Sequence, residues 1–496
     1  AGAKAGPLLI RAWNDAGASA PIALLVEEVA QTAEVEPNDD FRSPQVLSGS
    51  RVAVNGNHAK NGDVDTFAMD LKAGQEWVVW VDAYVLAAGF DAMLRITDLS
   101  GRVLAFNHDG PRNMDPFLVF KVPSDGRYLV QTMGHKYPAS TELEFAGGAD
   151  CVYRLHLCTE PLVRNTWPLA VQRGVKTRIN VEGWNLGAGP QEVEVEGRDG
   201  EKTREGFPIT LSDVPEFLET PEEAAAAVVR EVPFGVSGRM GLDGAERTSR
   251  FRGVKDSKIT FRVESARWGS ELDGWLKIRT LDGKELAAND DGVAGSNEPE
   301  LTWTVPADGE YVVAVGDLTR RGGGEFFYHL GATPAGAGIP KVSATVAQHS
   351  VIIEAGKPGE LKATIKFQGG PPADAAAGAE KPVHEIVARE LPDGIVMPPV
   401  EVPEKGGEVT VVFNASPTKA EAGKDAAAKA GAVSGPFRLV VRNRNGGEEF
   451  PVKYQMISIG ENNGVPTGYR ELLIPGTDWL WVTALPAAEA AAEAKK

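Results

Sequence analysis

The chain has 496 residues, of which 42% are hydrophobic, so it is long enough for several domains that each bury a core. Its formal net charge of −18 would repel a phosphate backbone, which excludes nucleic acid from the expected partners. The sequence has no run of about 18 apolar residues, so we expect no membrane span.

The N-terminal segment, residues 1–31, contains apolar runs at 8–12 and 22–26 with a turn sequence between them. These runs predict a pair of β-strands. Two strands alone are only marginally stable. We therefore expect the pair to pack on a neighbouring part of the chain or on a further domain.

A pattern of about a hundred residues then occurs twice, which predicts a modular protein. Modules of this kind usually bind, space or anchor, which argues against a single catalytic domain. The offset between the copies is 182 residues in the first blocks and 183 in the last. The shared blocks are Phe90–Ile96, Asn107–Gly110 and Val122–Tyr128 in the first copy, and Leu272–Ile278, Asn289–Gly292 and Val305–Tyr311 in the second.

Short alternating segments separated by turns predict an all-β protein of tandem β-sandwiches. We expect the two repeats at 34–160 and 232–334, a small β domain at 161–231, and an immunoglobulin-like sandwich at 339–485. Two Ala-rich inserts, around 373–381 and 419–433, interrupt the last domain. The tail, 486–496, is expected to be flexible.

The two cysteines, Cys151 and Cys158, flank a segment that alternates like a strand. Seven residues of strand would separate them by roughly 23 Å. A disulfide needs Cα atoms within about 7 Å. We therefore expect no bond between them.

The strongest local signal for chemistry is an acidic segment before the first repeat, followed by an acidic pair about 25 residues later. Hard cations prefer six to eight oxygen ligands, and carboxylates on the same side of an extended segment can supply several of them. The candidate ligands are Glu34, Glu36, Asn38, Asp39, Asp63 and Asp65. The alternative is that Asn38 and Asp39 cap a turn and the glutamates are solvated.

These residues carry a resemblance to a known family. The sequences Glu34-x-Glu-Pro-Asn-Asp, Asp63-x-Asp-x-Phe67 and Asp125-Gly-x-Tyr128 resemble the pattern of the bacterial pre-peptidase C-terminal domain, which includes the collagen-binding domains of clostridial collagenases. The resemblance covers residues 34–159. It implies a jelly-roll-like β-sandwich with calcium at its N-terminal linker. It places calcium ligation on Glu34, Glu36, Asn38, Asp39 and Asp65, with Asp63 or Asn61 as a further ligand.

The second repeat departs from this pattern. It reads Arg230–Phe234 where the acidic segment is expected and Glu246–Phe251 in place of the acidic pair, so calcium there is doubtful. It keeps an acidic turn that could form a second cation site from Asn289, Asp290, Asp291 and Glu298. An Asx turn between two strands is the interpretation we favour.

The order of the modules resembles the C-terminal part of large secreted proteins of planctomycete-type bacteria. In that comparison, residues 161–231 resemble an immunoglobulin-like linker domain of the transcription-factor (IPT/TIG) type. Residues 8–26 resemble the closing strands of another such domain.

Catalytic motifs are not evident in the sequence. There is no Gly-x-Ser-x-Gly motif and no Walker loop, and the zinc-protease pattern that starts at His384 lacks its second histidine because position 388 is Ala. We therefore expect no enzymatic activity. Exposed tryptophans could instead stack on a ligand, with core burial as the alternative. The candidates are Trp77, Trp80, Trp268 and Trp275.

Together these features predict a non-catalytic protein that is secreted, periplasmic or on the cell surface, and that acts in adhesion, substrate targeting or assembly with calcium as its cofactor. Its expected partner is an extracellular protein, a polysaccharide or another copy of itself. One alternative is an accessory region of a secreted peptidase or other hydrolase. Another is a structural subunit of a surface layer or filament.

Overall fold

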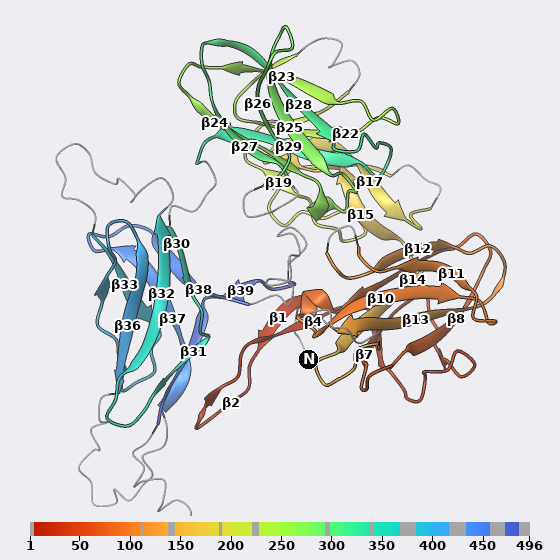
Figure 1. The fold of residues 1–496 in the computed structure, drawn as a ribbon, viewed down its shortest axis with the longest axis horizontal. Helices are drawn as coiled ribbons and strands as arrows, with labels where there is room; N and C mark the ends of the chain where they lie inside the picture. The colour runs from red at the N-terminus through yellow and green to blue at the C-terminus, as the bar shows by residue number, and fades with distance from the viewer. Residues whose placement is uncertain are drawn as a thin grey trace, which may run out of the picture. The chain divides into compact units, whose positions relative to one another are not determined.

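The computed structural model describes residues 4–110, 113–136, 144–187, 191–220, 228–292, 298–336, 342–367, 383–415, 433–456 and 472–485. Within these residues the protein is all-β, as predicted, and its helical elements are two 3-10 turns, η1 (Tyr84–Leu86) and η2 (Ala266–Trp268) (Figure 1). The described residues form two compact units. One joins residues 4–27 to the described residues of 342–456 and 473–485, and the other comprises those of 28–336 together with Leu472.

The first repeat folds into two five-stranded sheets around one core. The sheet orders are β11-β10-β13-β8-β6 and β12-β9-β14-β7-β5. Side chains at alternate strand positions fill the core, among them the fully buried Phe67, Trp77 and Phe90. The strands are β5 (Ala30–Ala33), β6 (Gln45–Val46), β7 (Arg51–Asn57), β8 (Asp65–Leu71), β9 (Glu76–Asp82), β10 (Phe90–Thr97), β11 (Val103–Asn107), β12 (Phe117–Lys121), β13 (Gly126–Lys136) and β14 (Val152–Cys158).

The edge strands β5 and β6 position the acidic segment. β5 pairs in parallel with β7 in one sheet, and β6 pairs in parallel with β8 in the other. The chain between them, residues 34–44, must therefore cross from one sheet to the other at one end of the sandwich. Glu34 to Asp39 lie in this crossing.

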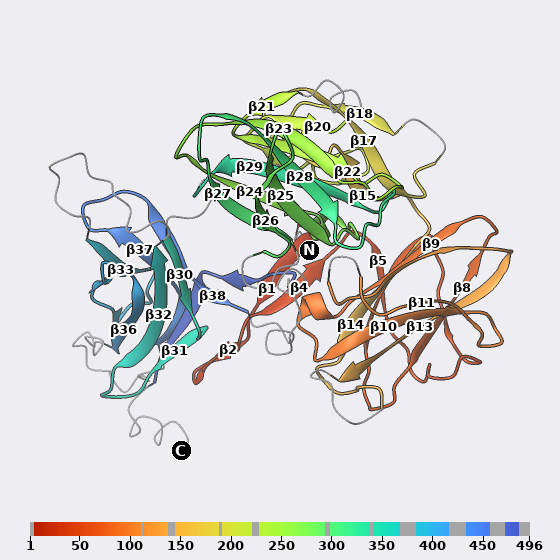
Figure 2. The same cartoon turned by 45° about the horizontal axis from the view of Figure 1, so that its top comes forward.

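The second repeat has the same topology. Its sheets have the orders β26-β25-β28-β23-β21 and β27-β24-β29-β22-β20, which match those of the first sandwich strand for strand (Figure 2). The strands are β20 (Glu216–Leu218), β21 (Val229–Glu231), β22 (Phe234–Arg239), β23 (Arg247–Gly253), β24 (Lys258–Glu264), β25 (Gly274–Thr280), β26 (Glu285–Asn289), β27 (Glu300–Thr304), β28 (Gly309–Asp317) and β29 (Phe327–Pro334).

The second sandwich therefore begins earlier than position 232. Strand β20 pairs with β22 in one sheet and strand β21 pairs with β23 in the other, although their residues fall in the small domain predicted at 161–231. Each has only three residues, which is too short to display an alternating pattern. In the same way, β5 belongs to the first sandwich although it begins within 1–31 and ends before residue 34.

A small β region lies between the sandwiches. Its sheets have the order β15-β17-β18 and the pair β16-β19, and its core contains Val171, Ile179 and Val195. Leu169 of this region packs with Trp268 and Phe327 of the second sandwich. The strands are β15 (Leu162–Trp167), β16 (Val171–Gln172), β17 (Thr177–Trp184), β18 (Glu192–Val195) and β19 (Leu211–Ser212).

The other unit is built from the C-terminal strands, whose main order is β31-β40-β37-β38-β30-β32-β36-β34. One core, with Phe413 and Phe437 fully buried, lies among them. The strands are β30 (Val342–Val346), β31 (Ser350–Ile353), β32 (Gly359–Phe367), β33 (His384–Arg389), β34 (Ile395–Val396), β35 (Val400–Glu401), β36 (Gly407–Ala415), β37 (Val433–Asn443), β38 (Glu449–Gln455), β39 (Gly476–Thr477) and β40 (Trp479–Ala484). The Ala-rich inserts, apart from Val433, and the tail lie outside the described residues.

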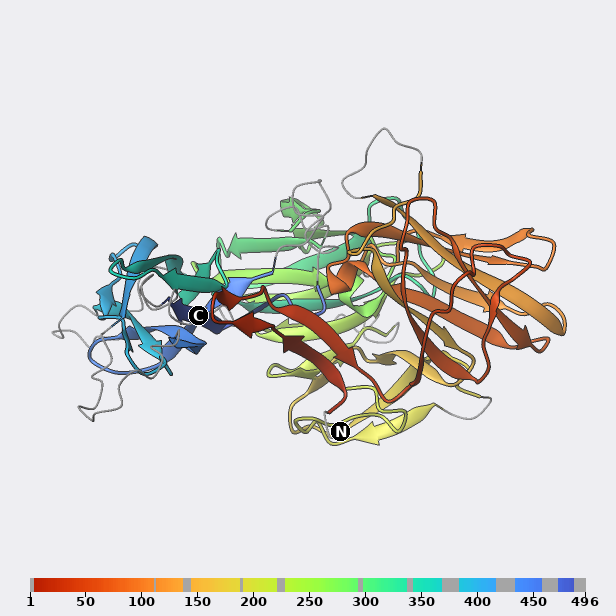
Figure 3. The same cartoon turned by 90° about the horizontal axis from the view of Figure 1, so that it is seen from below.

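The N-terminal strands pack on this unit. β1 (Gly6–Ile10) and β4 (Ile22–Val26) form the expected antiparallel pair, and β2 (Trp13–Asn14) and β3 (Gly17–Ala18) close it, as the dark red strands of Figure 3 show. The Trp13 ring lies 5.4 Å from that of Trp481, and Arg11 donates a hydrogen bond to the His349 carbonyl at 3.4 Å. The pair thus docks within the same chain.

The two cysteines are free and buried, as the spacing predicted. Burial raises the pKa of the Cys151 thiol to about 11 and that of Cys158 above its ordinary value. Both thiols are therefore protonated and unreactive at neutral pH. Within the described residues, no helix has the length and apolarity needed to cross a membrane.

Candidate metal centre

Four carboxylates converge at the end of the first sandwich where the chain crosses between the sheets. Glu36, Asp39, Asp63 and Asp65 each contribute an oxygen to a group whose members lie within 4.8 Å of one another. The first two come from the crossing segment. Asp65 begins β8, and Asp63 precedes it by two residues. We call these four residues the carboxylate cluster.

The cluster is buried at its centre. Asp63 and Asp65 are fully buried, and the Oδ1 atom of each has no hydrogen-bond partner within the described residues. Asn38 is also buried, and neither side-chain polar atom of this residue has a partner there. Its backbone holds the crossing in place, because its N–H donates to Glu36 Oε2 at 2.9 Å and its carbonyl accepts from the Thr66 N–H at 3.1 Å.

Glu34 lies beside the cluster and is joined to it through a tyrosine. The Tyr153 hydroxyl is 2.8 Å from Glu34 Oε2 and 2.6 Å from Asp65 Oδ2. The Asn57 N–H also donates to Glu34, at 3.0 Å. Gly56 makes this approach possible, since a Cβ there would lie 2.1 Å from the Glu34 carboxylate and 2.3 Å from the tyrosine ring.

The electrostatics follow from burial and crowding. Burial, followed by the charge of Asp65, raises the pKa of Glu34 to about 7. Burial, followed by the contacts with Asp39 and Asp65, raises the pKa of Asp63 to about 6. Hydrogen bonds with Asp63 and then Lys60 lower the pKa of Asp39. The site thus concentrates negative charge where little water can reach it.

One positive charge is close to the cluster. The Lys60 Nζ lies 2.8 Å from Asp39 Oδ2 and 3.9 Å from Asp63 Oδ1, and its side chain is 63% exposed. A single exposed ammonium cannot balance four carboxylates. A divalent cation with oxygen ligands fits this donor set, because calcium takes six to eight oxygens and tolerates irregular geometry. The cluster would hold the ion, with the Asn38 amide oxygen and Glu34 available to complete the shell.

The structure also brings in residues that sequence reasoning missed. His58 is fully buried, stacks on Tyr153 with 4.8 Å between ring centroids, and places Nδ1 3.1 Å from Asp65 Oδ2. In the sequence, the only indication that His58 belongs to the site is its position five residues before Asp63. Tyr153 gave none, because it reaches the site from a strand almost ninety residues downstream. The Asn61 Oδ1 accepts from the Gly147 N–H at 3.2 Å, and its role as a further ligand stays a prediction.

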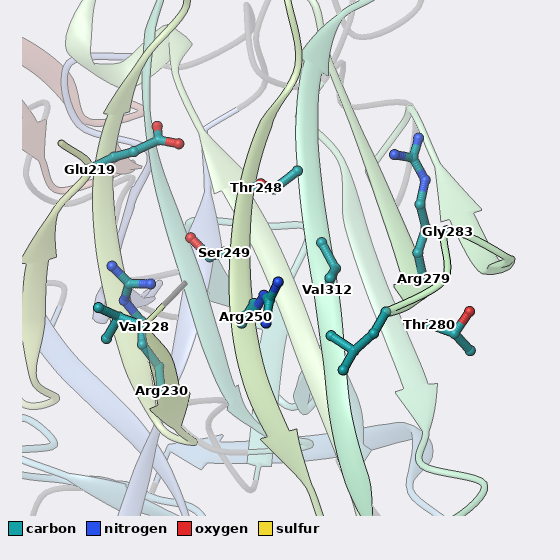
Figure 4. A pocket seen from close by; sticks show the side chains of 11 residues that line it. Glu219, Val228, Arg230, Thr248, Ser249, Arg250, Arg279, Thr280, Gly283 and Val312 are labelled. Carbon is teal, nitrogen blue, oxygen red and sulfur yellow. The ribbon is translucent and has the colours of Figure 1, made fainter. Parts of the chain in front are cut away.

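The equivalent end of the second sandwich has the opposite charge. β23 begins at Arg247, 182 residues after Asp65 begins β8, so a guanidinium stands where the first sandwich has a carboxylate. Glu219 takes the place of Glu34, because it follows β20 as Glu34 follows β5 and accepts from the Tyr328 hydroxyl at 2.9 Å. A pocket of about 240 Å³ on the same sandwich is lined by Glu219 together with Arg230, Arg250 and Arg279 (Figure 4).

Two of the four residues considered for a second cation site, Asn289 and Glu298, make separate hydrogen bonds within the chain. Asn289 Oδ1 accepts from the Asp291 N–H at 3.3 Å, which is the Asx turn that we favoured. Glu298 Oε1 instead accepts from the N–H groups of Ser265 and Ala266, at 2.5 and 2.8 Å. Its carboxylate thus anchors the start of η2. A second cation site formed by Asn289, Asp290, Asp291 and Glu298 stays an untested prediction, and the contacts of Asn289 agree with the Asx turn.

The four candidate tryptophans differ in burial. Trp77 and Trp268 are buried in cores, so the expectation that they stack on a ligand is wrong. Trp80 is half-buried, and its ring is stacked on His156 with a centroid distance of 4.3 Å and an interplanar angle of 4°. Trp275 is half-buried and has the Lys277 ammonium 5.2 Å from its centroid. The rings that remain accessible are thus in contact with side chains of the chain itself.

Comparison with known proteins gives limited matches. No protein-family model matches the chain. A stretch of 98 residues is 34% identical to a probable subtilase-type serine protease of Deinococcus radiodurans, covering 19% of this chain and 13% of that protein. The chain therefore spans about an eighth of this relative's length.

Solved structures give similarities of low score. A periplasmic inhibitor of g-type lysozyme from Aeromonas hydrophila matches with 14% identity and a TM-score of 0.17, over 26% of this chain and 96% of the inhibitor. Tandem CBM51 modules of a Streptococcus pneumoniae glycoside hydrolase match with 10% identity and a TM-score of 0.16, over 56% of this chain and 82% of theirs. Scores this low carry no inference about function.

Proposed function

We propose that this chain is a non-catalytic binding or assembly part of a secreted or cell-surface protein, and that calcium bound at the carboxylate cluster stabilises its first sandwich. The observation that carries the proposal is the convergence of Glu36, Asp39, Asp63 and Asp65 within 4.8 Å, with the last two fully buried. Such a group is costly unless some of its carboxyls are protonated or a cation compensates their charge.

The alternative, a capped turn with solvated glutamates, explains less. It accounts for the exposed Glu36 but not for the buried Oδ1 atoms of Asp63 and Asp65, which have no hydrogen-bond partner within the described residues. Calcium at the cluster would neutralise these carboxylates and tie the crossing segment to the start of β8. An ion that binds only the folded state stabilises that state in proportion to the logarithm of its concentration.

Titration calorimetry with calcium on the intact chain tests the proposal. We expect binding in the wild type and its loss in the double variant Glu36→Ala, Asp39→Ala. The matched control is Asp290→Ala, Asp291→Ala, which removes two exposed carboxylates from the second repeat. Absence of binding in the wild type, or equal binding in the cluster variant, would refute the calcium site. Loss of binding in the control alone would place the ion elsewhere.

A second function is supported by the match to the subtilase-type protease. The chain would then be an accessory region that holds a secreted peptidase on its substrate. Sedimentation with insoluble proteins and polysaccharides, together with a peptidase assay, distinguishes the two roles. An accessory region would sediment with a peptidase substrate without cleaving it, whereas binding to another copy of itself would indicate assembly. Cleavage by this chain alone would overturn both.

A further inference from the structure

A second group of potential metal ligands lies in the first sandwich, apart from the carboxylate cluster. Asp91 is the second residue of β10, and His108 and Asp109 follow the last residue of β11. Because β10 and β11 are antiparallel and Leu94 pairs with Asn107, the end of β11 runs back toward the start of β10. The fold thus brings all three side chains to one edge of the sheet.

The imidazole of His108 lies between the two carboxylates. Its Nε2 is 3.1 Å from Asp91 Oδ2 and its Nδ1 is 3.2 Å from Asp109 Oδ2, and one ligand atom from each of the three residues lies within 4.8 Å of the other two. Two donors that bind one tetrahedral metal at about 2.0 Å are about 3.3 Å apart. Because one ion binds only one ring nitrogen, the carboxylate that faces the other nitrogen must rotate before all three donors can close around the ion.

A buried, unpartnered atom points to an occupant. Asp91 is 8% exposed, and its Oδ1 has no hydrogen-bond partner within the described residues, while Oδ2 faces His108. A buried carboxylate oxygen without a donor is costly. His108 and Asp109 remain partly exposed, with 37% and 51% of their side chains accessible, so an ion can reach the group from solvent.

We propose that Asp91, His108 and Asp109 form a three-ligand site for a divalent transition metal, and that zinc is the ion its donors fit. An imidazole with two carboxylates suits zinc, which binds nitrogen and oxygen in tetrahedral sites, whereas calcium prefers oxygen alone. Three protein ligands leave one position open for water or for a ligand group.

A cleft beside Asp109 would give a ligand access to that open coordination position. Asp109 also lines a cleft of about 850 Å³, whose walls include Trp184 and Arg164. A metal held by Asp109 would lie at the edge of a space that admits a ligand. The second repeat lacks this arrangement, because its equivalent positions, Asp273, Asp290 and Asp291, contain no imidazole.

Zinc titration of the metal-free chain in the presence of saturating calcium tests the site separately from the carboxylate cluster. We expect one zinc ion per chain, with affinity at least ~10-fold lower in His108→Gln and in Asp91→Asn. The variants Glu36→Ala, Asp39→Ala and Asp290→Ala, Asp291→Ala should bind zinc like the wild type. Thermal melting without metal verifies that each variant is folded.

Cobalt provides a readout that needs no variant. Cobalt in a site with nitrogen and oxygen donors should give visible absorption bands that zinc abolishes by competition. No zinc uptake, or equal uptake in His108→Gln and the wild type, would show that His108 only pairs with the two aspartates. Uptake that disappears in the Glu36→Ala, Asp39→Ala variant alone would assign the zinc to the carboxylate cluster and refute the proposal.

Discussion

At the scale of single residues, the carboxylate cluster has a lysine ammonium beside it. Lys60 is the only lysine or arginine that forms an ion pair with the cluster in the described part of the chain. Its long exposed side chain can leave without disturbing the fold. A bound calcium ion and the Lys60 ammonium would compete for the same carboxylates.

Removing this competitor should strengthen calcium binding. We expect Lys60→Met to raise the calcium affinity by about 2- to 5-fold, since an exposed ion pair contributes little and is partly screened. Lys72→Met is the matched control, because Lys72 forms a similarly exposed pair with Asp125 at 2.9 Å on the same sandwich. Titration calorimetry on both variants measures the effect. Weaker binding in Lys60→Met would mean that the lysine supports the site.

The titration of the acidic side chains gives a second residue-scale prediction. With pKa values raised to about 7 for Glu34 and about 6 for Asp63, the metal-free folded chain holds more protons than the unfolded chain between about pH 4 and 7. These groups stabilise the fold fully at low pH, and that contribution is lost as the pH rises through 6 to 7. Calcium binds the ionised forms of these groups and should restore the lost stability.

The rise in melting temperature caused by calcium should therefore be small at about pH 5.5 and large at about pH 8. Melting curves with calcium and with a chelator, recorded across this range, measure the difference. The same melting curves for the Glu36→Ala, Asp39→Ala variant show how much of the pH dependence comes from other titrating groups. A calcium effect that is independent of pH would contradict the assignment of these carboxyls to the ion.

At the scale of secondary-structure elements, the two sandwiches use the same strands with different charges. Where β8 begins with Asp65, β23 begins with Arg247, whose Nε donates to the Arg239 carbonyl at 3.0 Å. The second sandwich thus has a cation built into its strand. Its fold should not depend on an ion from solution.

Replacing this arginine should destabilise the second sandwich. We expect Arg247→Met to lower the free energy of unfolding by about 1–3 kcal/mol, because a hydrogen-bonded charge is lost beside Glu219 and Tyr328. Arg252→Met is the control on the same strand, where the side chain is exposed and its pairs are longer than 3.5 Å. Denaturant unfolding measures both. An equal loss of unfolding free energy in the two variants would show that Arg247 stabilises the sandwich no more than Arg252 does.

The sequence predicted the sandwiches because their strands alternate and turn residues separate them. It also placed Glu36, Asp39, Asp63 and Asp65 in one candidate site, and the fold brings these four together. Whether they bind calcium remains a prediction. The alternation was visible because a core residue at every second position is a local property of each strand.

The contacts between distant strands were not visible in the sequence. Tyr153 and His58 reach the cluster only through tertiary structure, and β20 and β21 are too short to show a pattern. The strand register also aligns Arg247 with Asp65, whereas the sequence analysis gave only the range Glu246–Phe251 for the acidic pair.

At the scale of the whole molecule, the division into two units predicts more than one unfolding transition. The carboxylate cluster lies in the unit of residues 28–336. We therefore expect calcium to raise the temperature of one calorimetric transition and to leave the other unchanged. The Glu36→Ala, Asp39→Ala variant should abolish the shift. Movement of both transitions by the same amount would show that the units unfold together.

The buried, protonated thiols of Cys151 and Cys158 make the chain suitable for site-directed labelling. Maleimide dyes react with thiolates, so neither native cysteine should take up dye in the folded protein. A cysteine introduced at Leu242, whose side chain is 92% exposed, together with one at Ile352 in the other unit would accept a donor and an acceptor fluorophore. Energy transfer between them would then measure the distance between the two units in solution.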